Sequence, residues 1–128
     1  MNKLISLALA VTMLAPFGYA TDYVGTMSMA SGYSLDDVRV SIDEQGNMTL
    51  YRVKFARMMP VRVDVLIPQV KCDNEHLSGE DIIPSVNGKQ HPDRIVTHLH
   101  GTANKQALDF RCLFGGKEMH FKGVNSKK

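Results

Sequence analysis

The sequence lacks an excess of charge of either sign, because 15 Lys and Arg residues are nearly matched by 13 Asp and Glu residues. The charges are also dispersed, with acidic residues such as Asp43 and basic residues such as Arg52 spread along the chain. Nucleic-acid binding usually requires a strong basic stripe, and the sequence contains none. We therefore expect no nucleic-acid partner, and we interpret Lys127 and Lys128 as a solvated tail.

Motifs that carry catalysis or phosphate binding are missing as well. Ser31-Gly32-Tyr33-Ser34 does not form a Gly-x-Ser-x-Gly elbow, and no Gly-x-x-x-x-Gly-Lys run is present. Asp36 and Asp37 are adjacent, so on a strand they would face opposite ways and could not share a substrate. We therefore predict a protein that is not an enzyme, with no catalytic residue and no cofactor.

The chain has one long apolar run, Leu4 to Leu14, and this run of about 11 residues is shorter than the roughly 20 that cross a bilayer. Lys3 precedes it, and Phe17-Gly18-Tyr19-Ala20 follows with small residues at the positions typical of signal-peptide cleavage. No cysteine follows Ala20 to accept a lipid. We expect residues 1–20 to be a cleaved signal peptide and residues 21–128 to be one soluble domain without a membrane anchor, secreted or periplasmic.

The chain has only two cysteines, Cys72 and Cys112, and neither belongs to a Cys-x-x-Cys pair. A redox or nucleophilic cysteine usually has such a partner nearby. In the oxidising compartment that the signal peptide indicates, two cysteines are expected to bond. We therefore predict a structural disulfide between Cys72 and Cys112, closing a loop of about 40 residues and contributing about 4 kcal/mol by the chain-entropy estimate.

Apolar residues alternate with polar ones in short runs, which predicts strands and leaves little helical spacing. In the clearest run, Val61, Val63, Val65 and Ile67 share one face between two prolines. A bulge near Leu50 is expected, because the apolar face changes there. Strands are predicted over residues 23–31, 38–42, 48–55, 61–67, 70–72, 80–86, 94–101, 107–114 and 119–121, with turns at Gln45-Gly46-Asn47, Asn87-Gly88 and Gly115-Gly116. This pattern favours an all-β fold, a small antiparallel up-and-down β-barrel of about eight strands.

Several short segments, taken in order, resemble the calycin-like, lipocalin-like β-barrel family of exported bacterial proteins. The matching segments are Tyr23-Val24-Gly25-Thr26, Val38-Arg39-Val40-Ser41-Ile42, Gly46-Asn47-Met48-Thr49-Leu50, Met58-Met59-Pro60-Val61, Leu77-Ser78-Gly79-Glu80, Leu99-His100-Gly101-Thr102 and Met119-His120-Phe121-Lys122-Gly123. The Gly-x-Trp signature of lipocalins is absent, since the chain has no tryptophan. The resemblance implies the barrel fold and binding of a small apolar molecule, and it supplies no catalytic residue.

Three histidines form the one candidate metal site in the sequence. His98 and His100 are two residues apart on an expected strand, so their side chains would emerge on one face, and His120 could supply a third ligand. No carboxylate is tied to the pair by its spacing. Two exposed histidines on the wet face of a sheet explain the same residues, and we assign no metal ligand.

The function expected from the sequence is binding of a small apolar or amphipathic molecule. Candidate pocket residues are Met58, Met59, Tyr51 and Phe110, because unbranched methionine side chains suit an adaptable apolar pocket and Met58-Met59 would lie at a barrel mouth. The alternative is a protein-interaction domain of the cell envelope, such as an inhibitor of a lysozyme-type enzyme. Its contact loops would be Arg57 to Met59 and Gly88 to Asp93.

Overall fold

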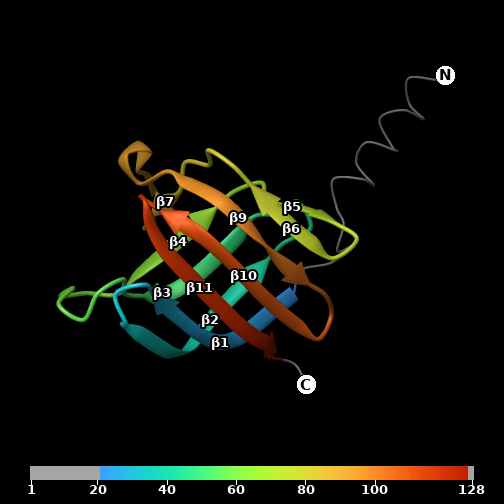
Figure 1. The fold of residues 1–128 in the computed structure, drawn as a ribbon, viewed down its shortest axis with the longest axis horizontal. Helices are drawn as coiled ribbons and strands as arrows, with labels where there is room; N and C mark the ends of the chain where they lie inside the picture. The colour runs from blue at the N-terminus through green and yellow to red at the C-terminus, as the bar shows by residue number, and fades with distance from the viewer. Residues whose placement is uncertain (1–20, 127–128) are drawn as a thin grey trace.

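The computed structural model describes residues 21–126, which are almost entirely β-structure; the expected signal peptide, residues 1–20, lies outside them. Within these residues 11 strands form one sheet, with one short 3-10 helix, η1 (Pro92–Arg94). The sheet is strongly curled (Figure 1). The strands are β1 (Thr21–Met29), β2 (Ser34–Ile42), β3 (Met48–Val53), β4 (Val63–Ile67), β5 (Lys71–Asp73), β6 (His76–Gly79), β7 (Ser85–Val86), β8 (Lys89–Gln90), β9 (Val96–Ala103), β10 (Ala107–Phe114) and β11 (Lys117–Asn125). The expected all-β, antiparallel fold class is confirmed.

The first and last strands are neighbours near the middle of the sheet. The strand order is β5-β6-β9-β10-β11-β1-β2-β3-β4-β7-β8, and every pair in it is antiparallel. The β1–β11 pair runs from Tyr23 opposite Asn125 to Met29 opposite Met119. Most other neighbouring strands are consecutive in sequence. The fold is therefore a meander in which the first strand, β1, pairs with the last, β11.

Contacts across the interior show that the sheet curls into a half-barrel. Phe55, which follows β3, stacks on Phe114 at the end of β10 with 4.7 Å between the ring centroids. These strands are four places apart in the sheet order, so only curling can bring their side chains together. At the open side, Ile82 exchanges two backbone hydrogen bonds with Val96 of β9, just before β7 pairs with β4. The segment from Ile82 to Val86 therefore bridges the two halves.

The concave face of the sheet holds one apolar core. Alternation in each strand turns every second side chain inward, as in β2, where Val38, Val40 and Ile42 are buried and Arg39 is exposed. The largest fully buried side chains come from most of the longer strands: Tyr23, Phe110, Phe121, Met27, Ile42, Met48, Leu50, Ile67, Leu99, Leu108, Met119 and Val38. Four methionines thus pack in this core, Met27, Met29, Met48 and Met119.

Glycines allow the central strands to approach each other closely. Gly25 of β1 lies opposite Gly123 of β11, and a Cβ atom added at Gly123 would lie 2.6 Å from the carbonyl oxygen of Val24. Gly101 of β9 lies opposite Phe110, and a Cβ there would be 2.8 Å from the Phe110 Cβ. Side chains at these positions would force the strands apart, so glycine is required for the tight curl.

The predicted turns and the predicted bulge are confirmed, but the strand count is wrong. The β3–β4 register shifts between Leu50 and Val53, where Arg52 has φ of 53°. Asn87 and Gly88 join β7 to β8 with φ values of 51° and 85°. The sheet has 11 strands in place of about eight because β6 and β8, which lie outside the predicted ranges, are only four and two residues long. Runs that short show no alternation in the sequence.

Val61 is a further difference from the prediction, because it lies outside β4, which begins at Val63, and its side chain is 61% exposed. The predicted disulfide is also wrong: Cys72 and Cys112 are both free thiols. Cys72 is in β5 and Cys112 in β10, with β6 and β9 between these strands. Adjacent strands lie about 4.8 Å apart, so along the sheet β5 and β10 are about 14 Å apart. A disulfide requires Cα atoms within about 7 Å.

No helix among residues 21–126 is long and apolar enough to cross a membrane.

Candidate functional site

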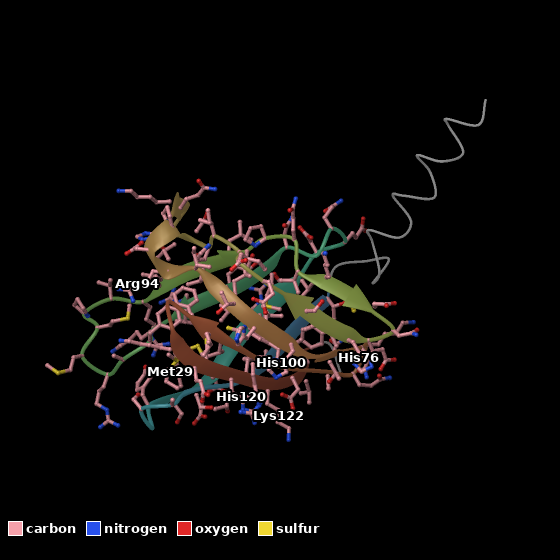
Figure 2. The ribbon with its side chains drawn as sticks, turned by 45° about the horizontal axis from the view of Figure 1, so that its top comes forward. Met29, His76, Arg94, His100, His120 and Lys122 are labelled. Carbon is pink, nitrogen blue, oxygen red and sulfur yellow. The ribbon has the colours of Figure 1, made fainter. Side chains whose placement is uncertain are left out.

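A row of polar side chains crosses the convex face of the sheet, one from each of four neighbouring strands. Ser28 of β1 lies opposite His120 of β11, His120 opposite Arg111 of β10, and Arg111 opposite His100 of β9. Side chains directly opposite in antiparallel strands have Cβ atoms about 5 Å apart. Figure 2 shows His100 and His120 along this side of the molecule, with Lys122 and His76 nearby. We call Ser28, His120, Arg111 and His100 the polar row.

The polar row borders a surface depression of about 330 Å³, which we call the outer-face depression. Its lining residues are Ser28, Met29, Ala30, His98, His100, Arg111, Cys112, Leu113, Glu118, Met119 and His120. The polar wall is formed by the imidazoles, the Arg111 guanidinium and the Glu118 carboxylate. The apolar lining residues are Ala30 and the half-buried Leu113, together with Met29, Cys112 and Met119, whose side chains are buried in the core beneath the sheet.

His98 lies on an irregularity of β9 that shapes the depression. The β9–β10 register shifts between Arg111 and Leu113, and His98 has φ of 55° in the left-handed region. Glu80 holds this conformation, because its Oε2 accepts hydrogen bonds from the His98 backbone N–H at 3.0 Å and lies 3.1 Å from the His98 Nδ1. The unusual backbone of His98 is therefore stabilised by a carboxylate from the segment before β7.

The other two histidines are oriented by different acceptors. The Nδ1 of His100 lies 2.9 Å from the backbone carbonyl of His98. Because a carbonyl only accepts, Nδ1 carries the proton, and Nε2 of the neutral ring is an acceptor. The Nε2 of His120 lies 2.8 Å from Oδ1 of Asp109 on β10, and the His120 side chain is 25% exposed. Each ring is thus fixed in place beside Arg111 before any ligand arrives.

Cys112 lies in the core beneath the depression and does not act as a nucleophile there. Its side chain is 3% exposed, and burial raises its pKa to about 12. Because the thiolate is the reactive form of cysteine, a thiol with so high a pKa is inert at neutral pH. Burial also raises the pKa of the half-buried Cys72 on β5.

The three histidines line one depression, but their ring nitrogens bond to separate acceptors. Within residues 21–126 no group of three or more His, Cys, Asp or Glu side chains is arranged to hold a metal ion. The anchors differ for each ring: Glu80 for His98, the His98 carbonyl for His100, and Asp109 for His120. The spacing of the histidines in the sequence thus identified a cluster, whereas the geometry suits hydrogen bonding to a ligand.

The candidate pocket residues from the sequence are not brought together. Phe110 is fully buried against Phe121, and Met58 is 91% exposed in the loop between β3 and β4. Met59 in the same loop is half-buried, with its Sδ 3.1 Å from the backbone nitrogen of Phe55. Tyr51 lies on the convex face, where the Arg39 guanidinium stacks over its ring at 4.7 Å. Gly88 to Asp93 covers β8 and the start of η1 and is mostly exposed.

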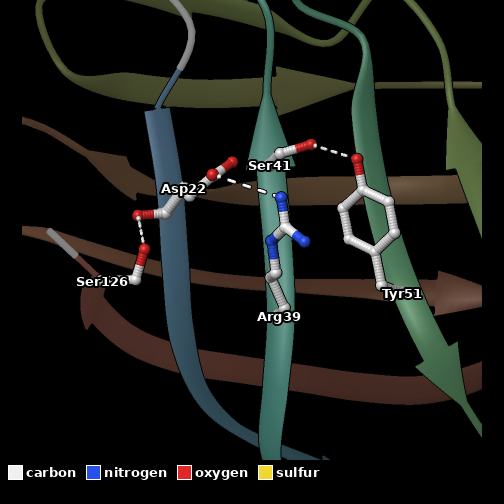
Figure 3. Close-up of polar contacts among 5 residues, drawn as sticks. All are labelled: Asp22, Arg39, Ser41, Tyr51 and Ser126. Carbon is white, nitrogen blue, oxygen red and sulfur yellow. Dashed lines mark hydrogen bonds and ion pairs between the residues drawn. The ribbon is translucent and has the colours of Figure 1, made fainter.

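A second polar network lies on the convex face around Tyr51. Figure 3 shows Asp22 joined to Arg39 by an ion pair of 3.3 Å and Ser41 bonded to the Tyr51 hydroxyl at 3.0 Å. Ser126 Oγ lies 3.4 Å from the Asp22 carbonyl. These contacts tie β1, β2, β3 and the end of β11 together. These polar groups bond to one another, so the network stabilises the pairing of these neighbouring strands.

Arg111 is the central residue of the depression that sequence reasoning missed. Its position in β10 makes it the polar partner of the inward Phe110 and Cys112, and this alternation was visible in the sequence. The pairing of Arg111 with His100 and His120 depends on the registers of β9 and β11, which no local pattern reveals.

The chain matches no protein family, no curated protein and no solved structure with which it was compared.

Proposed function

We propose that the protein is an exported binding module that takes a small amphipathic molecule with an anionic group in the outer-face depression. The observation that carries this proposal is the position of Arg111 between His100 and His120, in a depression that Leu113 also lines. The depression of about 330 Å³ falls in the size range of small-molecule sites.

Arg111 is the group of the wall that favours an anion, because the second ring nitrogens of His100 and His120 accept hydrogen bonds when the rings are neutral. Arg111 is always charged and presents a planar set of donors that matches a carboxylate or phosphate. The His100 and His120 rings are held by their own hydrogen bonds, so little side-chain freedom is lost when a ligand binds. Glu118 lies on the rim and disfavours a ligand whose negative charge extends in that direction.

The floor of the depression favours an apolar tail. Leu113 is half-buried on the outer face and Ala30 is exposed, so both offer apolar surface to a tail. Met29, Cys112 and Met119 point into the core and lie beneath this surface. A ligand that places its anionic end against Arg111 would therefore lay its tail along β10 and β11.

Catalysis by the same residues is the less favoured interpretation. Ser28, His120 and Asp109 have the residue types of a hydrolytic triad, and His120 is bonded to Asp109 at 2.8 Å. A nucleophile must lie within hydrogen-bond reach of its base. Among the hydrogen bonds of residues 21–126, none joins Ser28 to His120. We therefore assign the histidine to ligand contact.

The calycin-like relationship belongs to this proposal as well. It is supported by the antiparallel meander, by the pairing of the first and last strands, and by the curl of the sheet. In this proposal the ligand lies on the convex face, because the concave face is filled by the side chains of the core.

The test compares three probes of equal chain length by titration calorimetry: decanoate, decanol and decyltrimethylammonium. We expect decanoate to bind most tightly, and Arg111→Gln to weaken its binding at least tenfold. Arg94→Gln is the matched control, because Arg94 is also exposed but does not line the depression. Equal binding of all three probes, or an equal loss in both variants, would exclude the proposed site.

A further inference from the structure

The loop between β3 and β4, residues 54–62, combines exposed apolar side chains with a fixed conformation. Met58 is 91% exposed and Val61 is 61% exposed, and these are the two highest values among the exposed large apolar side chains of residues 21–126. Figure 1 shows this loop projecting from one end of the half-barrel. Its apolar residues are therefore presented to the surroundings at the outermost part of the molecule.

The other apolar residues of the loop explain why Met58 points away from the core. Phe55 stacks on Phe114, and Met59 packs against the core with its Sδ 3.1 Å from the Phe55 backbone nitrogen. The Met59 N–H donates to the Ala56 carbonyl at 3.1 Å, which closes a turn around Arg57 and Met58. Two anchors thus fix the base of the loop and leave its tip outside.

The loop and its base are strongly basic. Arg52, Lys54, Arg57 and Arg62 lie within one stretch of the chain, and no Asp or Glu occurs between Glu44 and Asp64. Arg52 and Arg62, with Arg39, also line a depression of about 380 Å³ at the base of the loop.

Two carboxylates, Asp37 and Asp64, line the same depression. Asp64 accepts a hydrogen bond of 2.8 Å from the Arg52 backbone N–H, and Arg39 forms an ion pair with Asp22. With Asp22, three carboxylates accompany the three guanidinium groups, so the excess positive charge at this end comes from Lys54 and Arg57 of the loop.

We propose that the 54–62 loop docks on a membrane surface that carries anionic phospholipids. In this arrangement Met58 and Val61 enter the boundary between headgroups and acyl chains, and Arg52, Arg57 and Arg62 contact the phosphate groups. An exposed apolar tip with basic side chains around it is the combination that binds such interfaces. The alternative is that a protein partner binds Arg57 to Met59. The lipid surface is favoured because the chain carries basic residues but no Asp or Glu between Glu44 and Asp64.

The absence of tryptophan from the chain allows a site-specific test. We would introduce one tryptophan by Met58→Trp and, as the matched control, by Gln106→Trp in the exposed loop between β9 and β10. Fluorescence is recorded with vesicles of phosphatidylcholine alone and with vesicles containing about 30% phosphatidylglycerol. We expect a blue shift only for Met58→Trp and only with the anionic vesicles.

Charge reversal provides a second, independent measurement. In vesicle sedimentation, Arg57→Glu should reduce partitioning onto the anionic vesicles at least fivefold, since each basic residue near the surface contributes a factor of about five. The control Lys71→Glu makes the same change in charge on β5 and should leave most binding intact. No blue shift at position 58, or equal losses in both charge variants, would overturn the proposal and leave a protein as the occupant of the loop.

Discussion

Phe110 and Arg111 are adjacent in β10, and they show how differently the two faces of the sheet are built. Phe110 is fully buried in a core made of apolar side chains from nearly every strand. Arg111 is exposed on the convex face, between two histidines from neighbouring strands. One face is closed by apolar packing, and the other presents side chains whose bonding groups are available to a ligand.

The two faces therefore separate stability from recognition. A change on the concave face leaves a cavity, because its neighbours are packed and cannot relax fully. A change on the convex face removes a hydrogen bond or an ion pair that water can replace. The following comparisons test this separation, beginning with the largest expected effect.

Phe110→Ala should lower the free energy of unfolding by about 4 kcal/mol, because it removes a fully buried ring. Tyr51→Phe, on the convex face, should cost about 1 kcal/mol, since it removes only the hydroxyl that contacts Ser41. Urea denaturation of both variants measures the difference. Similar losses would show that the two faces contribute equally to the free energy of unfolding.

Stability at alkaline pH should depend on Cys112. Burial raises its folded-state pKa from 9.0 to about 12, so the folded state favours the protonated thiol. This stabilisation is complete below pH 9 and is lost between pH 9 and 12, by about 1.4 kcal/mol per pH unit.

The matched variant is Cys112→Ala, which carries no thiol. Tyrosine and lysine residues titrate in both proteins, so the difference between the two pH profiles isolates Cys112. We expect the unfolding free energy of the variant to fall less steeply above pH 9. Parallel profiles would mean that the thiol is accessible to water in the folded state.

The smallest effect should come from the ion pair between Arg39 and Asp22. Their side chains are 54% and 27% exposed, so the pair is largely screened by water. Asp22→Asn, which keeps Arg39 over the Tyr51 ring, should lower the unfolding free energy by about 0.5 kcal/mol. In about 1 M salt the difference from the unaltered protein should shrink further. A loss as large as that of Phe110→Ala would contradict the conclusion that the concave face supplies most of the stability.

The strands with clear alternation were predictable from the sequence because they have one buried and one exposed face. Ala107 to Phe114 was predicted with the same bounds as β10, and the turn at Gly115-Gly116 follows it as expected. The bulge after Leu50 was visible because the apolar face changes there. Local chemistry is sufficient where the signal lies within one strand.

Features that depend on the pairing of distant segments were not predictable in the same way. The signal for a disulfide was the presence of two cysteines, and only the strand order shows that two strands separate β5 from β10. The outer-face depression is another case: the histidines were noted, but Arg111 joins them only through the registers of three strands. Val61 continued the alternation of β4, yet it lies in the loop.

The pairing of β1 with β11 also determines when the molecule can fold. Ser126 and Asp22 are in contact although 104 positions separate them, so the centre of the sheet is completed only when β11 is present. Until then β1 and β10 each have an unpaired edge, which is prone to pairing with other chains. Folding is therefore a late and cooperative event, with the milliseconds-to-seconds pace typical of β-proteins rich in distant contacts.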